Sequence, residues 1–155
     1  MDHIFQPFQS TYLAFGRNCI KINSFKEKDM SNYVLKKVLV IDCNEAILDV
    51  MRLIITDAGY NFVVPLSPFT PEKIFNLEPD LILIEDQLYN LQQGREISQS
   101  LKKSQLTSSI PIVIMTTSIK PENLILESEA DTFLIKPFDI QKLEEILYCF
   151  SKKKN

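Results

Sequence analysis

The sequence has little glycine, few cysteines and a single histidine. Only three glycines occur in 155 residues, with neither a GxGxxG nor a P-loop motif. Because backbone cradles for phosphate are built from glycine-rich loops, an enzyme or nucleotide binder with such a cradle is the least favoured hypothesis. The cysteines Cys19, Cys43 and Cys149 are odd in number and unrelated in spacing. They predict reduced thiols, without a disulfide framework or a cysteine metal site.

Long apolar runs and an excess of positive charge are also missing. No stretch approaches the ~20 apolar residues that span a bilayer, and no basic segment followed by an apolar run opens the chain. We therefore expect a cytoplasmic protein without a membrane segment. The formal net charge is -3, and the one basic run lies in the predicted tail, residues 152–155. No nucleic-acid-binding surface is expected.

The length suits one domain with an extension. Residues 1–35 carry scattered aromatic residues without a clear period, which predicts an extension that is mobile or loosely docked outside the core. Residues 36–151 are patterned throughout and form the predicted domain. The chain ends just past the last expected helix, so we expect a single-domain protein without an output domain.

The patterned region alternates short apolar runs with helical stripes. Such runs, apolar at every position, are typical of parallel strands covered on both faces. They occupy residues 38–41, 62–64, 81–84, 112–115 and 133–135. Between them, Thr70 with Pro71, Pro121 and Asp139 are expected helix starts, and Gly59 an expected stop. Five β-α repeats predict an α/β fold with a doubly wound parallel sheet.

In such sheets the functional crevice lies beyond the carboxyl ends of the strands. Asp42 follows the first run, Glu85 and Asp86 follow the third, Thr116 the fourth and Lys136 the fifth. Carboxylates, a hydroxyl and an ammonium should therefore converge on one rim. This rim is a plausible place for a divalent cation, a phosphoryl group or a carboxylate held by the lysine.

Several segments resemble response-regulator receiver domains in order and spacing. They are residues 37–42, 57–60, 79–85, 110–116 and 130–139. The resemblance covers about residues 36–150. It implies a flavodoxin-like (βα)5 fold with strand order 2-1-3-4-5, a role in two-component phosphorelay signalling, and no enzymatic activity.

The resemblance also implies roles for single residues. Asp42 matches an acid that holds Mg²⁺, and Thr116 and Lys136 match residues that contact the phosphoryl group. Phe133 matches an aromatic switch, although plain packing is an equal alternative. The peptide bond before Pro137 is often cis in this family. A histidine kinase or a downstream signalling protein is the implied partner.

Two positions depart from the family pattern. Cys43 stands where the second acid is expected, and Glu85 stands at the position of the phospho-accepting aspartate. Mg²⁺ prefers oxygen ligands, so any Mg²⁺ held by Asp42 and Glu85 should bind weakly. Glu85 is also one methylene too long, and small misplacements are expensive in rate. We expect a degenerate site, in which Glu85 either mimics phosphorylation or pairs with Lys136 in a vestigial pocket.

The register of the acceptor has an alternative. Counting forward from residues 79–80 gives Glu85, whereas counting back from Gly94 gives Asp86. A working receiver that accepts phosphate on Asp86 or Glu85 is thus the main competing hypothesis. The favoured hypothesis is a module that acts by protein contacts through about residues 120–150, with Leu124, Leu126 and Tyr148 as candidates.

Overall fold

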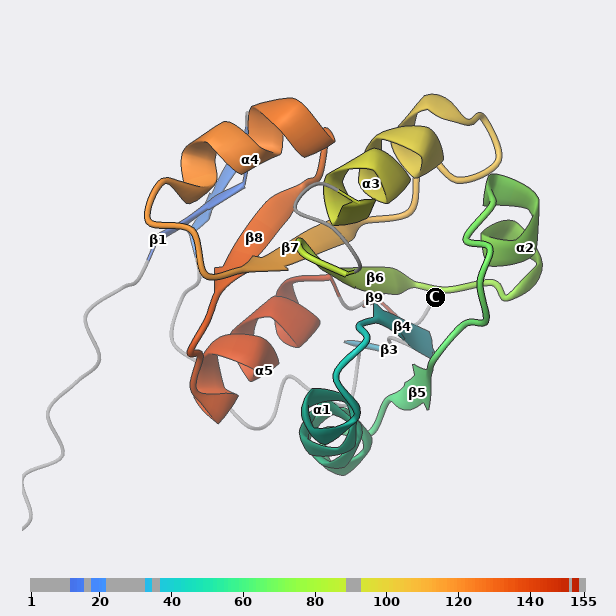
Figure 1. Cartoon of the computed structure of the whole chain (residues 1–155). Coiled ribbons are helices and arrows are strands. Elements are labelled where there is room, and N and C mark those ends of the chain that lie inside the picture. Colours follow the sequence, from blue (N-terminus) through green and yellow to red (C-terminus); the bar gives the residue numbers. More distant parts are fainter. Residues whose placement is uncertain are drawn as a thin grey trace, which may run out of the picture.

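A computed structural model describes residues 37–88 and 93–150 with their side chains. It also places the strand residues 12–15, 18–21, 33–34 and 152–153. Its centre is a five-stranded parallel sheet with the order β5-β4-β6-β7-β8, or 2-1-3-4-5 in chain order within the sheet (Figure 1). The strands are β4 (Lys37–Ile41), β5 (Asn61–Val63), β6 (Leu81–Glu85), β7 (Ile112–Thr116) and β8 (Thr132–Ile135). The predicted doubly wound fold is confirmed.

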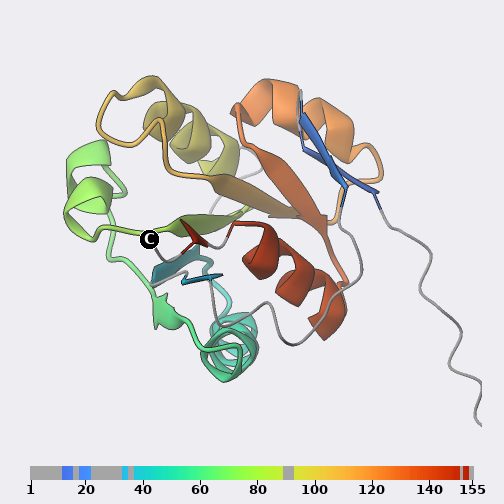
Figure 2. The ribbon, with the colours of Figure 1, turned by 180° about the vertical axis from the view of Figure 1, so that it is seen from behind.

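Helices cover both faces of this sheet, as two opposite views show (Figures 1 and 2). Helices α1 (Glu45–Asp57) and α5 (Ile140–Cys149) lie on one face. Helices α2 (Pro71–Asn76), α3 (Gln93–Lys103) and α4 (Pro121–Ser128) lie on the other. The longest of them has 13 residues. Within the described part of the chain, none has the length and apolar character needed to cross a bilayer.

The buried strands explain why the apolar runs are continuous. Val38 and Val40 of β4 pack with α1 and α5, whereas Leu39 and Ile41 pack toward α2, α3 and α4. Successive side chains of a strand point to opposite faces. A strand between two helical layers therefore needs an apolar residue at every position.

The helix ends follow local chemistry. Thr70 and Asp139 each accept a backbone hydrogen bond at the start of α2 and α5, as predicted. Pro121 opens α4, and Gly59 ends the turn after α1 with φ +89°. A side-chain cap of this kind contributes about 1 kcal/mol to stability. Asn44, which the sequence did not single out, caps α1 in the same way.

Four short strands lie outside the central sheet. β1 (Tyr12–Phe15) pairs with β2 (Asn18–Lys21), and β3 (Tyr33–Val34) pairs with β9 (Lys152–Lys153), both antiparallel. The second pair joins residues from the predicted extension and the predicted tail. The division into extension, domain and tail stays a prediction, and the other residues of 1–36 lie outside the described ones.

Candidate functional site

The carboxyl ends of the central strands meet at one edge of the sheet. In the strand register, Ile41 lies opposite Ile84, and Thr116 lies opposite Ile135. The strands therefore end nearly in step. The backbone N–H of Lys136 donates to the carbonyl oxygen of Thr116 at 2.7 Å, which holds the two strand ends together. This alignment places the polar residues that follow the strands on one rim.

Lys136 lies between two carboxylates on that rim. Its ammonium forms an ion pair with Oε2 of Glu85, and a second with Oδ2 of Asp42 at 3.6 Å. The side chains of Lys136, Glu85 and Asp42 are only 18%, 12% and 2% exposed. Little water screens these charges, so each carboxylate interacts strongly with the lysine.

Backbone groups complete the pocket. Oδ1 of Asp42 accepts from the backbone N–H of Asn44 at 2.8 Å, and Oε1 of Glu85 accepts from that of Gln87 at 3.3 Å. The other Asp42 oxygen, Oδ2, is buried and has no hydrogen bond, only the longer contact to Lys136. Both carboxylates are thus held in place.

These donors fit a Mg²⁺ ion poorly. Mg²⁺ takes an octahedral shell of oxygen ligands, and the cluster offers two carboxylates that already share one ammonium. Cys43 is exposed, and its Sγ donates to the carbonyl oxygen of Leu88 at 3.1 Å. Across the residues whose positions are described, no group of three or more His, Cys, Asp or Glu forms a metal cluster.

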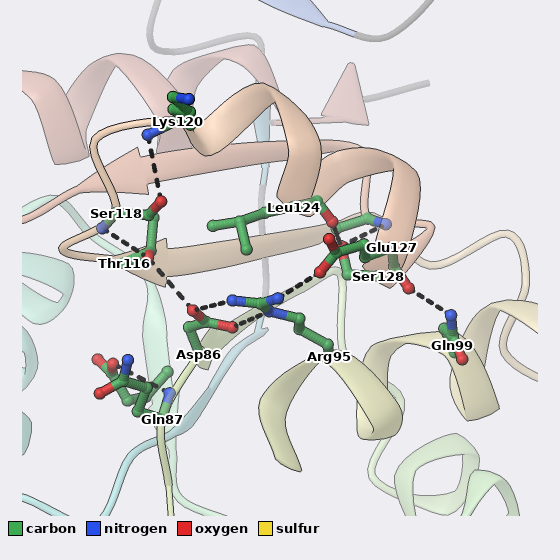
Figure 3. Close-up of polar contacts among 12 residues, drawn as sticks. Asp86, Gln87, Arg95, Gln99, Thr116, Ser118, Lys120, Leu124, Glu127 and Ser128 are labelled. Atoms are coloured by element: carbon green, nitrogen blue, oxygen red, sulfur yellow. Dashed lines mark hydrogen bonds and ion pairs between the residues drawn. The ribbon is translucent and has the colours of Figure 1, made fainter. Parts of the chain in front are cut away.

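Asp86 has a separate set of partners. The residue is 1% exposed, and its carboxylate accepts from Nε and Nη2 of Arg95 at 2.8 and 3.1 Å (Figure 3). The hydroxyl of Thr116 also donates to Asp86, at 3.3 Å. Thr116, which the family resemblance matched to a phosphoryl-contacting residue, is therefore hydrogen-bonded to Asp86. Arg95 was missed, although a buried carboxylate predicts a cationic partner.

The other predicted residues also lie near the edge. Phe133 is half-buried in β8, opposite Ile114 of β7. The peptide bond between Lys136 and Pro137 is cis, as the resemblance implied. Whether Phe133 acts as a switch stays a prediction.

The thiols of Cys43 and Cys149 are both free. Burial, with a smaller contribution from nearby Glu145, raises the pKa of Cys149 to about 11. The Cys19 thiol lies outside the described residues.

Acids, a hydroxyl and a lysine gather at the carboxyl edge of a doubly wound five-stranded sheet, which is where this class of α/β protein carries its functional site. The comparisons identify the family within that class. The sequence model of the family described as response regulator receiver domain matches residues 38–148, and the chain belongs to this family. Receiver domains are signalling modules of two-component systems, of a non-enzymatic kind, that interact with histidine kinases or other partners.

The alignments with curated relatives cover about half of each relative's length. The DNA-binding dual master transcriptional regulator RpaA of Synechocystis sp. is 28% identical over 112 residues, which cover 70% of this chain and 46% of that protein. The phosphate regulon transcriptional regulatory protein PhoB of Pseudomonas aeruginosa is 30% identical over 111 residues, covering 70% and 48%. The chain thus spans about half the length of these relatives.

Solved receiver structures share the fold. The chemotaxis response regulator CheY4 of Vibrio cholerae superposes with a TM-score of 0.62 at 21% identity, covering 76% of this chain and 99% of that one. The receiver domain of the sensor histidine kinase PA1611 of Pseudomonas aeruginosa, whose structure has a magnesium ion in the active-site cleft, gives 0.61 at 18% identity, covering 76% and 98%. At this identity the likeness shows the fold alone.

Proposed function

We propose that this receiver domain does not accept a phosphoryl group in the ordinary way and signals by binding protein partners. The observation that carries the proposal is the position of Lys136, whose ammonium is paired with Glu85 and Asp42. A receiver needs a reactive carboxylate and a cation to neutralise the incoming phosphoryl group. Here the lysine already neutralises the carboxylate at the acceptor position.

The length of the Glu85 side chain also argues against phosphoryl transfer to this residue. One additional methylene moves the carboxylate by about 1.5 Å, and misplacement on that scale costs on the order of a hundredfold in rate. The poor Mg²⁺ donor set adds a second loss, because the metal would neutralise developing charge. Mimicry of the phosphorylated state and a vestigial ion pair both agree with the pairing of Glu85 and Lys136.

The alternative acceptor, Asp86, has little support. An acceptor carboxylate must meet a phosphodonor from solvent, whereas Asp86 is buried. Both of its oxygens already accept charge-assisted hydrogen bonds from Arg95. Such bidentate pairs are among the stronger polar contacts in proteins. Asp86 is therefore better explained as part of the fold than as a reactive group.

The partner surface that we propose lies on α4 and its neighbours, within about residues 120–150. Within this range Leu126 is 81% exposed, Ile135 and Ile140 are also exposed, and Ile119, just before it, is 93% exposed. Covering exposed aliphatic side chains with a partner removes apolar surface from water and therefore favours binding. Of the predicted contact residues, Leu126 suits this role, but Leu124 does not, because it is buried against the sheet.

We further propose that the receiver region binds no nucleic acid directly. The whole chain has a formal net charge of -3, so no overall excess of positive charge favours contact with phosphates. RpaA is named a DNA-binding regulator, and that name describes the whole relative, about twice the matched length. Any partner of this chain is therefore expected to be a signalling protein.

Intact-mass spectrometry after incubation with acetyl phosphate and Mg²⁺ tests the proposal. Wild type, Glu85→Gln and Asp86→Asn are compared with the double substitution Cys43→Asp with Glu85→Asp, which restores the family pattern. We expect no phosphoryl-sized gain in wild type and a gain in the double variant. A gain in wild type that Glu85→Gln or Asp86→Asn abolishes would identify the acceptor and overturn the proposal.

A further inference from the structure

The buried carboxylate of Asp86 connects strand β6 to helix α4 by two separate routes. The first passes through Arg95 in the first turn of α3. Its Nη1 forms an ion pair with Glu127, in the last turn of α4, while its Nε and Nη2 bind Asp86 (Figure 3). Gln99, one turn further along α3, donates to the carbonyl oxygen of Glu127. One guanidinium thus joins a strand end to the end of another helix.

The second route reaches the beginning of the same helix. The Thr116 hydroxyl, which donates to Asp86, accepts from the backbone N–H of Ser118 at 3.0 Å. The Ser118 hydroxyl in turn accepts from the backbone N–H of Lys120 at 3.2 Å. Lys120 directly precedes α4 and provides no side-chain cap of its own. The connection that leads into α4 is therefore held by the same carboxylate (Figure 3).

Helix α4 needs such support because its own stability is low. It has only 8 residues, and isolated helices of this length are marginal in water. Leu124 is its one fully buried aliphatic side chain, next to the buried Pro121 and Ser128, and Ile125 packs against the same core only in part. Two aliphatic side chains therefore fix its position, and polar contacts at its ends carry a larger share.

We infer that Asp86 is a positioning residue that holds α4 by both ends, and that the Asp86–Arg95 pair determines the conformation of the α4 surface. The raised pKa of Arg95, caused first by its hydrogen bond to Asp86, agrees with a strong pair. Loss of Arg95 removes the contact from Asp86 to Glu127 and leaves Gln99 as the remaining link between α3 and the last turn of α4. Loss of the Asp86 carboxylate also removes the Thr116 contact and loosens residues 117–120. The inference concerns α4 itself and rests on the proposed function only for the consequence that partner binding changes with it.

Hydrogen exchange of the free full-length chain, followed by mass spectrometry, tests this inference without a partner. We expect Arg95→Met to speed exchange in residues 121–128 roughly ten- to a hundredfold, the effect of losing charge-assisted hydrogen bonds. Helices α1 and α5, on the opposite face, should keep their protection. The matched control is Lys103→Gln, which removes the exposed pair between Lys103 of α3 and Glu129 after α4. It should leave exchange in α4 unchanged.

Two milder variants separate the routes and keep the test decisive if Arg95→Met fails to fold. Glu127 is exposed, so Glu127→Gln should not disturb the core and should loosen only the last turn of α4. Thr116→Val should loosen only residues 117–120. Unchanged protection of α4 in Glu127→Gln and Arg95→Met would overturn the inference. So would an equal loss of protection in all five helices, because that result indicates general destabilisation. Phosphodonor and partner assays play no part, so failure here is distinct from failure of the proposed function.

Discussion

Replacing Lys136 by methionine removes the ammonium that two buried carboxylates share. The side chain keeps nearly the same length, so the change is mainly one of charge. Glu85 and Asp42 are then left close together with like charges. Breaking a buried ion pair by removing one partner is strongly destabilising, because the remaining charge is uncompensated.

The magnitude follows from the geometry. Across the 3.6 Å that separates Lys136 Nζ from Asp42 Oδ2, the Coulomb attraction is about 5 kcal/mol at an effective dielectric constant of about 20. Desolvation of the ammonium cancels part of this attraction. We expect Lys136→Met to lower the free energy of unfolding by about 2–4 kcal/mol. For a protein of this size, that loss corresponds to a fall in Tm of roughly 5–15 °C.

Urea and thermal unfolding, followed by circular dichroism, measure this loss. The control is the double variant Lys136→Met with Glu85→Gln, which removes one carboxylate together with the ammonium. It should recover at least half of the lost stability, because only Asp42 then lacks a partner. If the single variant stays within about 0.5 kcal/mol of wild type, as an ordinary surface substitution does, or the double variant recovers nothing, the electrostatic account of the cluster is wrong.

Two further predictions concern packing and thiol chemistry. A Cβ atom at Gly94 would lie 2.1 Å from the backbone oxygen that ends β6; Gly94→Ala should therefore cost about 2–4 kcal/mol in urea unfolding, and a loss below 1 kcal/mol would contradict the packing. In a Cys19→Ser background at pH 8, Cys43 should react with a maleimide much faster than Cys149. Burial raises the pKa of Cys149 from 9.0 to about 11, which leaves roughly a hundredfold less thiolate. Its labelling rate should rise with pH up to about 11, and equal rates at pH 8 for the two thiols would refute the burial argument.

The sequence was sufficient for the sheet and for one half of the site. Continuous apolar runs predict strands covered on both faces, and the edge that they share is set by topology. The convergence of Asp42, Glu85 and Lys136 follows from these two facts. The second strand begins one residue earlier than predicted, because the exposed Asn61 joins the ladder without an apolar signal.

The other half of the site depends on tertiary placement. The alternation along β6 puts Glu85 and Asp86 on opposite sides, but it does not say what Asp86 meets there. Arg95 reaches Asp86 because Gly94 lets α3 begin against the end of β6. Thr116 donates to Asp86 for a different reason, because a buried carboxylate needs hydrogen-bond donors and this hydroxyl lies within reach. Cys43 points outward to Leu88, a contact that no local pattern indicates.

The register of β4 has a consequence for biosynthesis. Val38 of β4 pairs with Phe62 of β5 on one side and with Leu81 of β6 on the other, 43 residues further along the chain. At a synthesis rate of about 5–20 residues per second, the ribosome needs roughly 2–9 s to make that interval. During this time an apolar strand has an open edge, which is a template for pairing with other chains. The nascent protein should therefore depend on chaperones most while the segment between β4 and β6 is being made.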